Sequence, residues 1–166
     1  MSSADSAWSR VTRSEEETIA CGREIALQLP RRAVVLLTGN LGAGKTTLAK
    51  GILSGLGVAA EEEVSSPTFT LIHEYPTGRQ AQELSRRAFH IDLYRLDTPR
   101  EIESIGFEEF LYDPKAISCV EWGEKASRLL PGKAYHVKLH VINEHSRQIQ
   151  IRHTKKANRR VQAQGR

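Results

Sequence analysis

The sequence lacks any long apolar run, and no stretch approaches the roughly 18 consecutive residues that a membrane-spanning helix needs. Its first residues, MSSADSAWSRVTRSEEE, are polar and contain no apolar stretch of the kind that a secretory signal peptide carries. Cysteine is scarce: Cys21 lies in a helical pattern and Cys119 in an apolar run, which favours reduced, buried thiols over a disulfide framework. We therefore expect a cytoplasmic protein.

Acidic residues are missing from the C-terminal end. The net charge is +4, but six of the 24 Lys and Arg residues lie within residues 152–166, where there is no Asp or Glu.

A chain of this length supports one well-buried core and not two full-sized domains. We expect residues 1–153 to form one domain and residues 154–166 to form a basic, disordered tail, which is a candidate for contact with RNA.

Helices are indicated by caps and by periodic apolar residues. Ser14 and Glu17 form a capping box that begins a helix, and Pro30 ends that segment. Thr98 and Glu101 form a second capping box, with Pro99 at the first helical position, where its missing N–H costs nothing. Two further helices are predicted over residues 46–56 and 123–130.

Strands are indicated by short apolar runs and by alternation. Residues 33–37 and 117–122 read as buried strands, and residues 69–75 and 88–93 as a hairpin with an extended tip at 76–87. Alternation over residues 135–143 and 148–153 predicts a C-terminal β-hairpin. The pattern as a whole predicts a single-domain α/β fold, with a mixed central sheet flanked by helices.

A glycine-rich turn joins the first buried strand to the helix that follows it. Its sequence fits the pattern GxxxxGK[ST] and is followed by Thr47; its residues are Gly39, Asn40, Leu41, Gly42, Ala43, Gly44, Lys45 and Thr46. In such a P-loop, backbone N–H groups and the positive end of the helix bind phosphates. Lys45 contributes a cation to the β- and γ-phosphates, and the Thr46 hydroxyl ligates Mg²⁺. The turn therefore predicts a nucleoside triphosphate site with Mg²⁺.

A P-loop site also needs an acid for Mg²⁺ or for the attacking water. Asp92 lies on one face of its strand, opposite Phe89 and Ile91, and Glu121 ends the other apolar run. Both acids remain candidates for the catalytic role, and either could be a surface carboxylate. Thr68, after Pro67, offers a hydroxyl in a segment placed to sense the γ-phosphate.

The sequence favours one kind of nucleotide and leaves an alternative class of enzyme open. Neither NKxD nor a DxxG after the P-loop is present, so ATP is favoured over GTP. A small-molecule kinase is the alternative to an ATPase with a conformational output. Such a kinase usually needs an arginine-bearing lid, for which Arg86, Arg87 and Arg95 are the nearby candidates.

Five blocks of sequence, in order along most of the chain, resemble the TsaE family. They are LTGNLGAGKTTLAKGIL (Leu37–Leu53), SSPTFTLIHEY (Ser65–Tyr75), HIDLYRL (His90–Leu96), SIGFEEFL (Ser104–Leu111) and VEW (Val120–Trp122). The chain departs from the family pattern at Asn40, where relatives often have Asp, in a longer and more basic 76–87 linker, and in its basic tail.

The resemblance implies a function. TsaE-like proteins are small P-loop ATPases that bind the TsaB–TsaD pair and support threonylcarbamoylation of adenosine 37 in tRNAs that read ANN codons, with ATP and Mg²⁺ as cofactors. It implies that Lys45 and Thr46 bind nucleotide and Mg²⁺ and that Glu121 is the second acid beside Mg²⁺. By the same resemblance, Asp92 and Thr68 are functional, Trp122 lies near the nucleotide, and Thr12 touches the adenine side.

Overall fold

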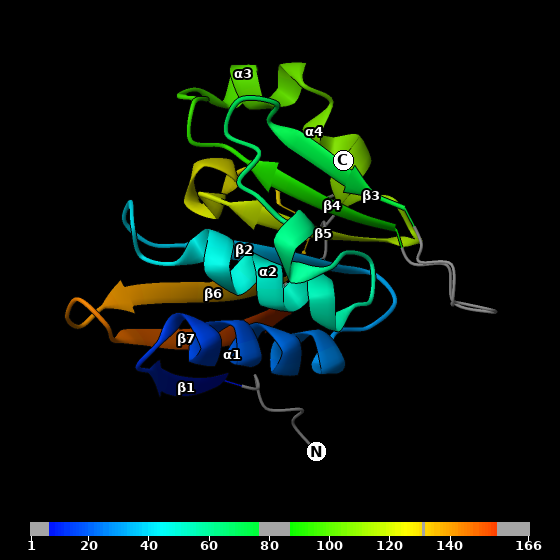
Figure 1. The fold of residues 1–166 in the computed structure, drawn as a ribbon. Helices are drawn as coiled ribbons and strands as arrows, with labels where there is room; N and C mark the ends of the chain where they lie inside the picture. The colour runs from blue at the N-terminus through cyan, green and yellow to red at the C-terminus, as the bar shows by residue number, and fades with distance from the viewer. Residues whose placement is uncertain (1–6, 77–86, 131, 156–166) are drawn as a thin grey trace, which may run out of the picture.

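The computed structural model describes residues 7–76, 87–130 and 132–155. Within them, one sheet of seven strands has the order β1-β7-β6-β2-β5-β4-β3 (Figure 1). The strands are β1 (Ala7–Thr12), β2 (Ala33–Thr38), β3 (Ile72–Tyr75), β4 (Arg87–Asp92), β5 (Ala116–Glu121), β6 (Lys133–Val141) and β7 (Arg147–Lys155). The helices are α1 (Glu15–Gln28), α2 (Lys45–Gly55), α3 (Pro99–Ser104) and α4 (Phe107–Leu111), with two 3-10 turns, η1 (Glu61–Glu63) and η2 (Gly123–Ala126).

The sheet is mixed, as the sequence predicts. Strands β6, β2, β5 and β4 run parallel to one another, whereas the pairs β3–β4, β7–β6 and β1–β7 are antiparallel. The predicted hairpins are therefore present as β3–β4 and β6–β7. The tip of the first hairpin, at residues 77–86, lies outside the described residues.

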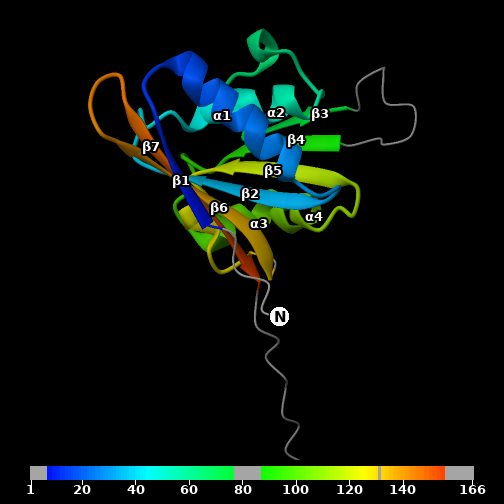
Figure 2. The same ribbon diagram turned by 90° about the horizontal axis from the view of Figure 1, so that it is seen from below.

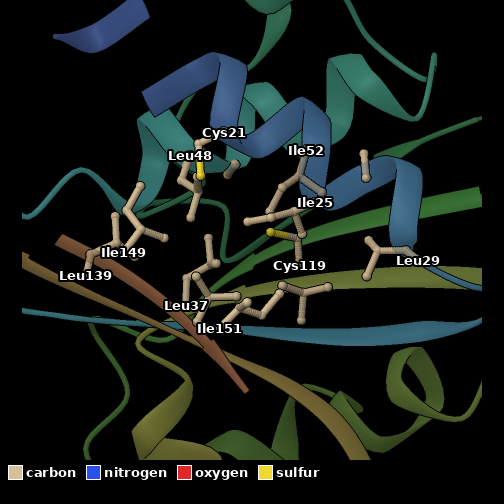
Figure 3. Packing of buried hydrophobic residues seen from close by; sticks show 14 of the residues in the cluster. Cys21, Ile25, Leu29, Leu37, Leu48, Ile52, Cys119, Leu139, Ile149 and Ile151 are labelled. Atoms are coloured by element: carbon tan, nitrogen blue, oxygen red, sulfur yellow. The ribbon is translucent and has the colours of Figure 1, made fainter. Parts of the chain in front are cut away.

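Helices cover both faces of the sheet: α1 and α2 pack on one side and α3 and α4 on the other (Figure 2). The first face builds a core in which Leu37, Leu139 and Ile149 of the sheet meet Ile25 and Ile52 of the helices (Figure 3). The second face builds a smaller core from β2, β4, β5 and the short helices. Since β2 and β5 are buried on both faces, their sequences are almost continuously apolar, whereas β4 carries the buried polar residues His90 and Asp92.

Both predicted capping boxes begin helices. Ser14 accepts a hydrogen bond from the backbone N–H of Glu17, 3.1 Å away, and the Glu17 carboxylate accepts from the N–H of Arg13 rather than from that of Ser14. Thr98 and Glu101 form the full reciprocal box at the start of α3. These caps satisfy backbone donors that a helix start would otherwise leave unpaired.

Some elements differ from the sequence-based expectations. Strand β1 and helix α4 were not predicted, and β3 begins at Ile72 because residues 67–71 turn, with Leu71 at a φ of 67°. The helix expected over residues 123–130 is only the 3-10 turn η2. Strand β7 continues to Lys155, and the Thr154 hydroxyl lies 3.4 Å from the carbonyl oxygen of Ala134, so the ordered sheet extends past the expected domain limit at residue 153. Residues 156–166 lie outside the described part.

No helix within the described residues is long and apolar enough to cross a membrane.

Candidate nucleotide site

The P-loop connects the carboxyl end of β2 to the first turn of α2. Gly39 adopts a φ of +152°, and a Cβ at this position would lie 2.7 Å from the carbonyl oxygen of Leu139, so the close approach of β6 requires glycine. Gly44 caps α2 at a φ of +99°. The loop is braced from β7 by Arg147, whose guanidinium donates to the carbonyl oxygens of Ala43, at 3.1 Å, and Gly42, at 3.3 Å.

Lys45 occupies the centre of the loop. Its Nζ donates to the carbonyl oxygens of Gly39 (2.7 Å) and Asn40 (2.9 Å) and lies 4.0 Å above the centre of the Trp122 ring. Burial lowers the pKa of Lys45, and the carboxylate of Glu121 opposes this shift. The residue thus presents a desolvated cation, whose attraction to phosphate is stronger than it would be in water.

Thr46 and Glu121 meet across the site, although 75 residues separate them. The Thr46 hydroxyl lies 2.9 Å from one oxygen of the Glu121 carboxylate and 3.0 Å from the other. On the far side, Nε2 of His90 lies 2.7 Å from Glu121 Oε1. Glu121 ends β5, directly beside the end of β2, because these two strands pair in parallel register. A hydroxyl and a carboxylate thus converge where the P-loop begins its helix.

Asp92 is also buried at this edge of the sheet, but its carboxylate holds a different segment. Oδ2 accepts hydrogen bonds from the hydroxyls of Ser66, at 2.7 Å, and Thr68, at 3.0 Å. Oδ1 accepts from the backbone N–H of Tyr94, at 2.8 Å. The backbone N–H of Asp92 in turn donates to the carbonyl oxygen of Leu71. Asp92 therefore ties residues 66–71 to the end of β4, while Glu121 faces the P-loop.

A cavity of about 770 Å³ opens over these residues, which is large enough for a nucleotide-sized ligand. Most of the predicted site residues line it: Leu41, Gly42, Gly44, Lys45, Thr46, Thr47, Thr68, Asp92, Glu121 and Trp122. Gly39, Asn40 and Ala43 are not among the lining residues, although the carbonyl oxygens of Gly39 and Asn40 hold Lys45. Trp122 sits at a φ of 59° and contacts Tyr94, with ring centres 5.2 Å apart.

Thr12 does not line the cavity. It is buried, and its hydroxyl lies 2.8 Å from that of Thr18. Thr18 itself lines the cavity, with Ser14 and Glu15, so the start of α1 reaches the site through these neighbours of Thr12. The contact of Thr12 with adenine remains a prediction, and in this arrangement Thr18 lies between Thr12 and the cavity.

Sequence reasoning missed several residues of the site. His90 lies two residues before Asp92 on the same face of β4, and this alternation is the signal by which its position could have been found. Glu144 and His145 of the β6–β7 turn, and Arg147 at the start of β7, line the cavity, yet nothing in their local sequence marks them. Only the pairing of β6 with β2 brings this turn to the P-loop.

Arg87 and Arg95, two of the arginines considered for a kinase lid, do not line the cavity. Arg87 pairs with Glu74 and lies 3.7 Å from Asp113, at the opposite end of β4 from Asp92. Arg95 lies over the ring of Phe69, 4.0 Å from its centre. Arg86 falls outside the described residues.

Within the described residues there is no group of three or more His, Cys, Asp or Glu side chains suited to a metal ion. Mg²⁺ in nucleotide sites is typically held by one or two protein oxygens, by phosphates and by water. The Thr46 hydroxyl and the Glu121 carboxylate, already within hydrogen-bond distance, are hard oxygen donors that fit this pattern.

Comparison with known proteins identifies the family. The family model described as "Threonylcarbamoyl adenosine biosynthesis protein TsaE" matches residues 12–151. The chain belongs to the TsaE family. It is 36% identical over 141 residues to the tRNA threonylcarbamoyladenosine biosynthesis protein TsaE of Treponema pallidum, covering 85% of this chain and 97% of that protein. It is 39% identical over 140 residues to the TsaE protein of Nostoc sp., and the alignment covers 82% of this chain and 80% of that protein.

The fold is also found in a solved structure. The crystal structure of YdiB from Bacillus subtilis superposes with a TM-score of 0.69 at 28% sequence identity, covering 95% of this chain and 91% of that one. Family and fold together confirm a P-loop domain of the TsaE type, in a family involved in tRNA threonylcarbamoyladenosine biosynthesis.

Proposed function

We propose that this protein binds ATP with Mg²⁺ at residues 39–47 and hydrolyses the ATP. In this proposal, it supports threonylcarbamoylation of adenosine 37 in tRNAs that read ANN codons, through a nucleotide-dependent interaction with TsaB and TsaD. The observation that carries the proposal is the convergence of Lys45, Thr46 and Glu121 beside one cavity. Membership of the TsaE family supports the pathway.

The chain's own groups account for phosphate binding. Backbone N–H groups of the loop and the start of α2 point positive charge at an anion. Lys45 adds a desolvated cation, which lies over the ring of Trp122. Thr46 and Glu121 would hold Mg²⁺, which when bound neutralises charge on the phosphate oxygens.

Coupling to partners would run through residues 66–71. Asp92 fixes this segment through Ser66 and Thr68, whose hydroxyls are two residues apart at the cavity wall. A γ-phosphate within reach of the Thr68 hydroxyl would compete for that hydroxyl. The position of the segment would then depend on which nucleotide is bound. Phe69 at its tip is 81% exposed and is available to report this state to another protein.

The test is to measure ATP turnover by the isolated chain and in the presence of its cognate TsaB and TsaD. We expect slow turnover alone and faster turnover with both partners, together with nucleotide-dependent retention of the chain on a TsaB–TsaD column. Rapid turnover without partners that depends on an added metabolite would instead support the small-molecule kinase. That outcome is unexpected, because Arg95 lies over Phe69 and Arg87 pairs with Glu74, and neither arginine lines the cavity.

Contact with tRNA is proposed to be indirect, through TsaB and TsaD, or to involve the basic tail. Removal of residues 156–166, which lie beyond β7, should leave ATP turnover unchanged. The same truncation separates any contribution of the tail to RNA binding from that of the domain.

A further inference from the structure

His90 is a buried polar residue to which the proposed chemistry gives no role. It lies in the middle of β4, between β3 and β5, and its side chain is 0% exposed. It faces the same side of the sheet as Asp92, yet it does not line the cavity. A bound nucleotide would therefore meet Glu121 and not His90.

The contacts of His90 converge on one partner. Its Nε2 lies 2.7 Å from Oε1 of Glu121, whereas its Nδ1 is buried without any hydrogen-bond partner among the described residues. An unpaired buried polar atom is costly, so packing alone would favour an apolar side chain here. The feature that distinguishes histidine from an apolar residue at this position is the hydrogen bond to Glu121.

This hydrogen bond fixes the direction of the Glu121 carboxylate. A carboxylate accepts hydrogen bonds and cannot donate them, so Nε2 of His90 donates this hydrogen bond to Glu121. The Thr46 hydroxyl approaches both carboxylate oxygens from the P-loop side, at 2.9 Å and 3.0 Å. Glu121 is thus held between β4 and α2. A histidine ring, with two rotatable bonds and complete burial, is a rigid support for it.

We propose that His90 is a positioning residue that orients Glu121 toward Thr46. The inference rests on the proposed function, in which Thr46 and Glu121 hold the Mg²⁺ that accompanies ATP. Side chains that support a metal ligand from behind commonly change metal affinity or activity about 10- to 100-fold when they are replaced. Loss of the His90 contact should therefore lower the affinity of the site for Mg²⁺ and leave the binding of Mg²⁺-free nucleotide intact.

The experiment compares His90→Gln with His90→Asn. Glutamine places an amide N–H at about the reach of Nε2, whereas asparagine is one methylene shorter and cannot span to Glu121. His73→Asn is the matched control, because His73 lies directly opposite His90 on β3 and Glu121 is not among its contacts. Thermal unfolding of each variant identifies any that fails to fold.

Three readouts separate positioning from simple packing. In His90→Asn, the Mg²⁺ concentration for half-maximal binding of a fluorescent ATP analogue should rise about 10-fold or more. The value of kcat should fall by about the same factor while KM for ATP at saturating Mg²⁺ changes little. Binding of the analogue without Mg²⁺ should be unchanged. His90→Gln and His73→Asn should behave like the parent protein in all three.

A fourth readout does not depend on ATP. In a crystal structure of His90→Asn, the Glu121 carboxylate should have rotated out of hydrogen-bond distance of the Thr46 hydroxyl, whereas in His90→Gln it should remain there. Unchanged Glu121 geometry, together with an unchanged Mg²⁺ requirement, would overturn the inference. If the parent protein binds no ATP at all, the proposed function fails, and the crystal structures alone decide the role of His90.

Discussion

At the scale of the residue, Lys45 combines three environments within one side chain. Its ammonium group is held by two carbonyl oxygens, lies over an aromatic ring and is attracted by the Glu121 carboxylate. Burial disfavours the charge, and these neighbours restore it. A phosphate would complete this set of negative partners, which is the physical reason for placing a lysine in so enclosed a position.

Replacement of Lys45 should abolish ATP binding. Lys45→Ala removes the cation from the loop, and we expect the affinity for ATP to fall by at least about 100-fold, as loss of a buried charge contact implies. Isothermal titration with ATP and Mg²⁺ measures this. Lys50→Ala, farther along the same helix, is the control and should bind ATP like the parent protein. Micromolar affinity in Lys45→Ala would show that the site lies elsewhere.

The two buried acids should have separable roles. Glu121→Gln removes the charge beside Thr46, and kcat should fall by about 100-fold or more with a smaller change in ATP affinity. Asp92→Asn leaves Thr46 and Glu121 in place but weakens the anchoring of Ser66 and Thr68. It should therefore impair stimulation by TsaB and TsaD more than basal turnover. Steady-state ATPase assays with and without partners test both, and the reverse pattern would exchange the roles.

The local sequence predicted the P-loop well and its surroundings less well. Gly39, Gly44, Lys45 and Thr46 form one contiguous pattern whose chemistry is local. The choice between Asp92 and Glu121 depends on where residues 66–71 and the P-loop lie in space, and no short-range pattern holds that information.

At the scale of the element, α1 and α2 cross at unusually close range. A Cβ on Gly51 would lie 2.1 Å from the carbonyl oxygen of Ile19, and a Cβ on Gly22 would lie 2.5 Å from that of Leu48. Two glycines facing each other therefore allow the helix backbones to touch. The P-loop leads directly into the start of α2, so this contact also sets the position of the P-loop relative to α1.

Gly51→Ala should destabilise the protein, although alanine is the better helix former. On an exposed helix face the substitution would gain about 1 kcal/mol. Here the added methyl group meets backbone atoms, and overpacking of this kind costs about 1–3 kcal/mol or more, so the net effect should be a loss. Urea unfolding gives the difference. Leu27→Ala, at an exposed position of α1, should change stability by no more than about 0.5 kcal/mol.

Elements with a cap, an apolar run or a clear alternation were predictable, whereas β1 and α4 were not. Strands β2 and β5 are apolar because both of their faces are buried, and α1 carries a cap and a periodic face. Strand β1 lies at the edge of the sheet with most of its residues exposed, so its sequence reads as polar. Helix α4 has five residues, which is too short for periodicity to appear.

At the scale of the whole molecule, the larger core encloses both cysteines. Cys21 of α1 and Cys119 of β5 are each almost completely buried among apolar side chains (Figure 3). Burial raises the pKa of Cys21 to about 11, and burial also raises that of Cys119. Both thiols are therefore protonated at neutral pH and unreactive in the folded state.

The raised pKa of the Cys21 thiol predicts that the protein loses stability at alkaline pH. A raised pKa contributes stability that is complete below the ordinary value of 9.0 and is lost as the pH rises toward about 11 for Cys21. Stability of the parent protein should thus fall by about 1 kcal/mol more than that of Cys21→Ala between pH 8 and pH 10. Urea unfolding at the two pH values measures this. Equal losses in the two proteins would show that Cys21 does not titrate as its burial implies.

The strand order has a consequence for how the molecule forms during synthesis. The P-loop follows β2, but both neighbours of β2 in the sheet, β5 and β6, are made from the later part of the chain. Such long-range parallel pairing closes slowly, because large loops must be ordered before any contact compensates for them. The P-loop sequence therefore leaves the ribosome well before the strands that flank β2 have been made. Until β6 has been translated, a growing chain carries the complete P-loop sequence without the sheet that gives it its shape.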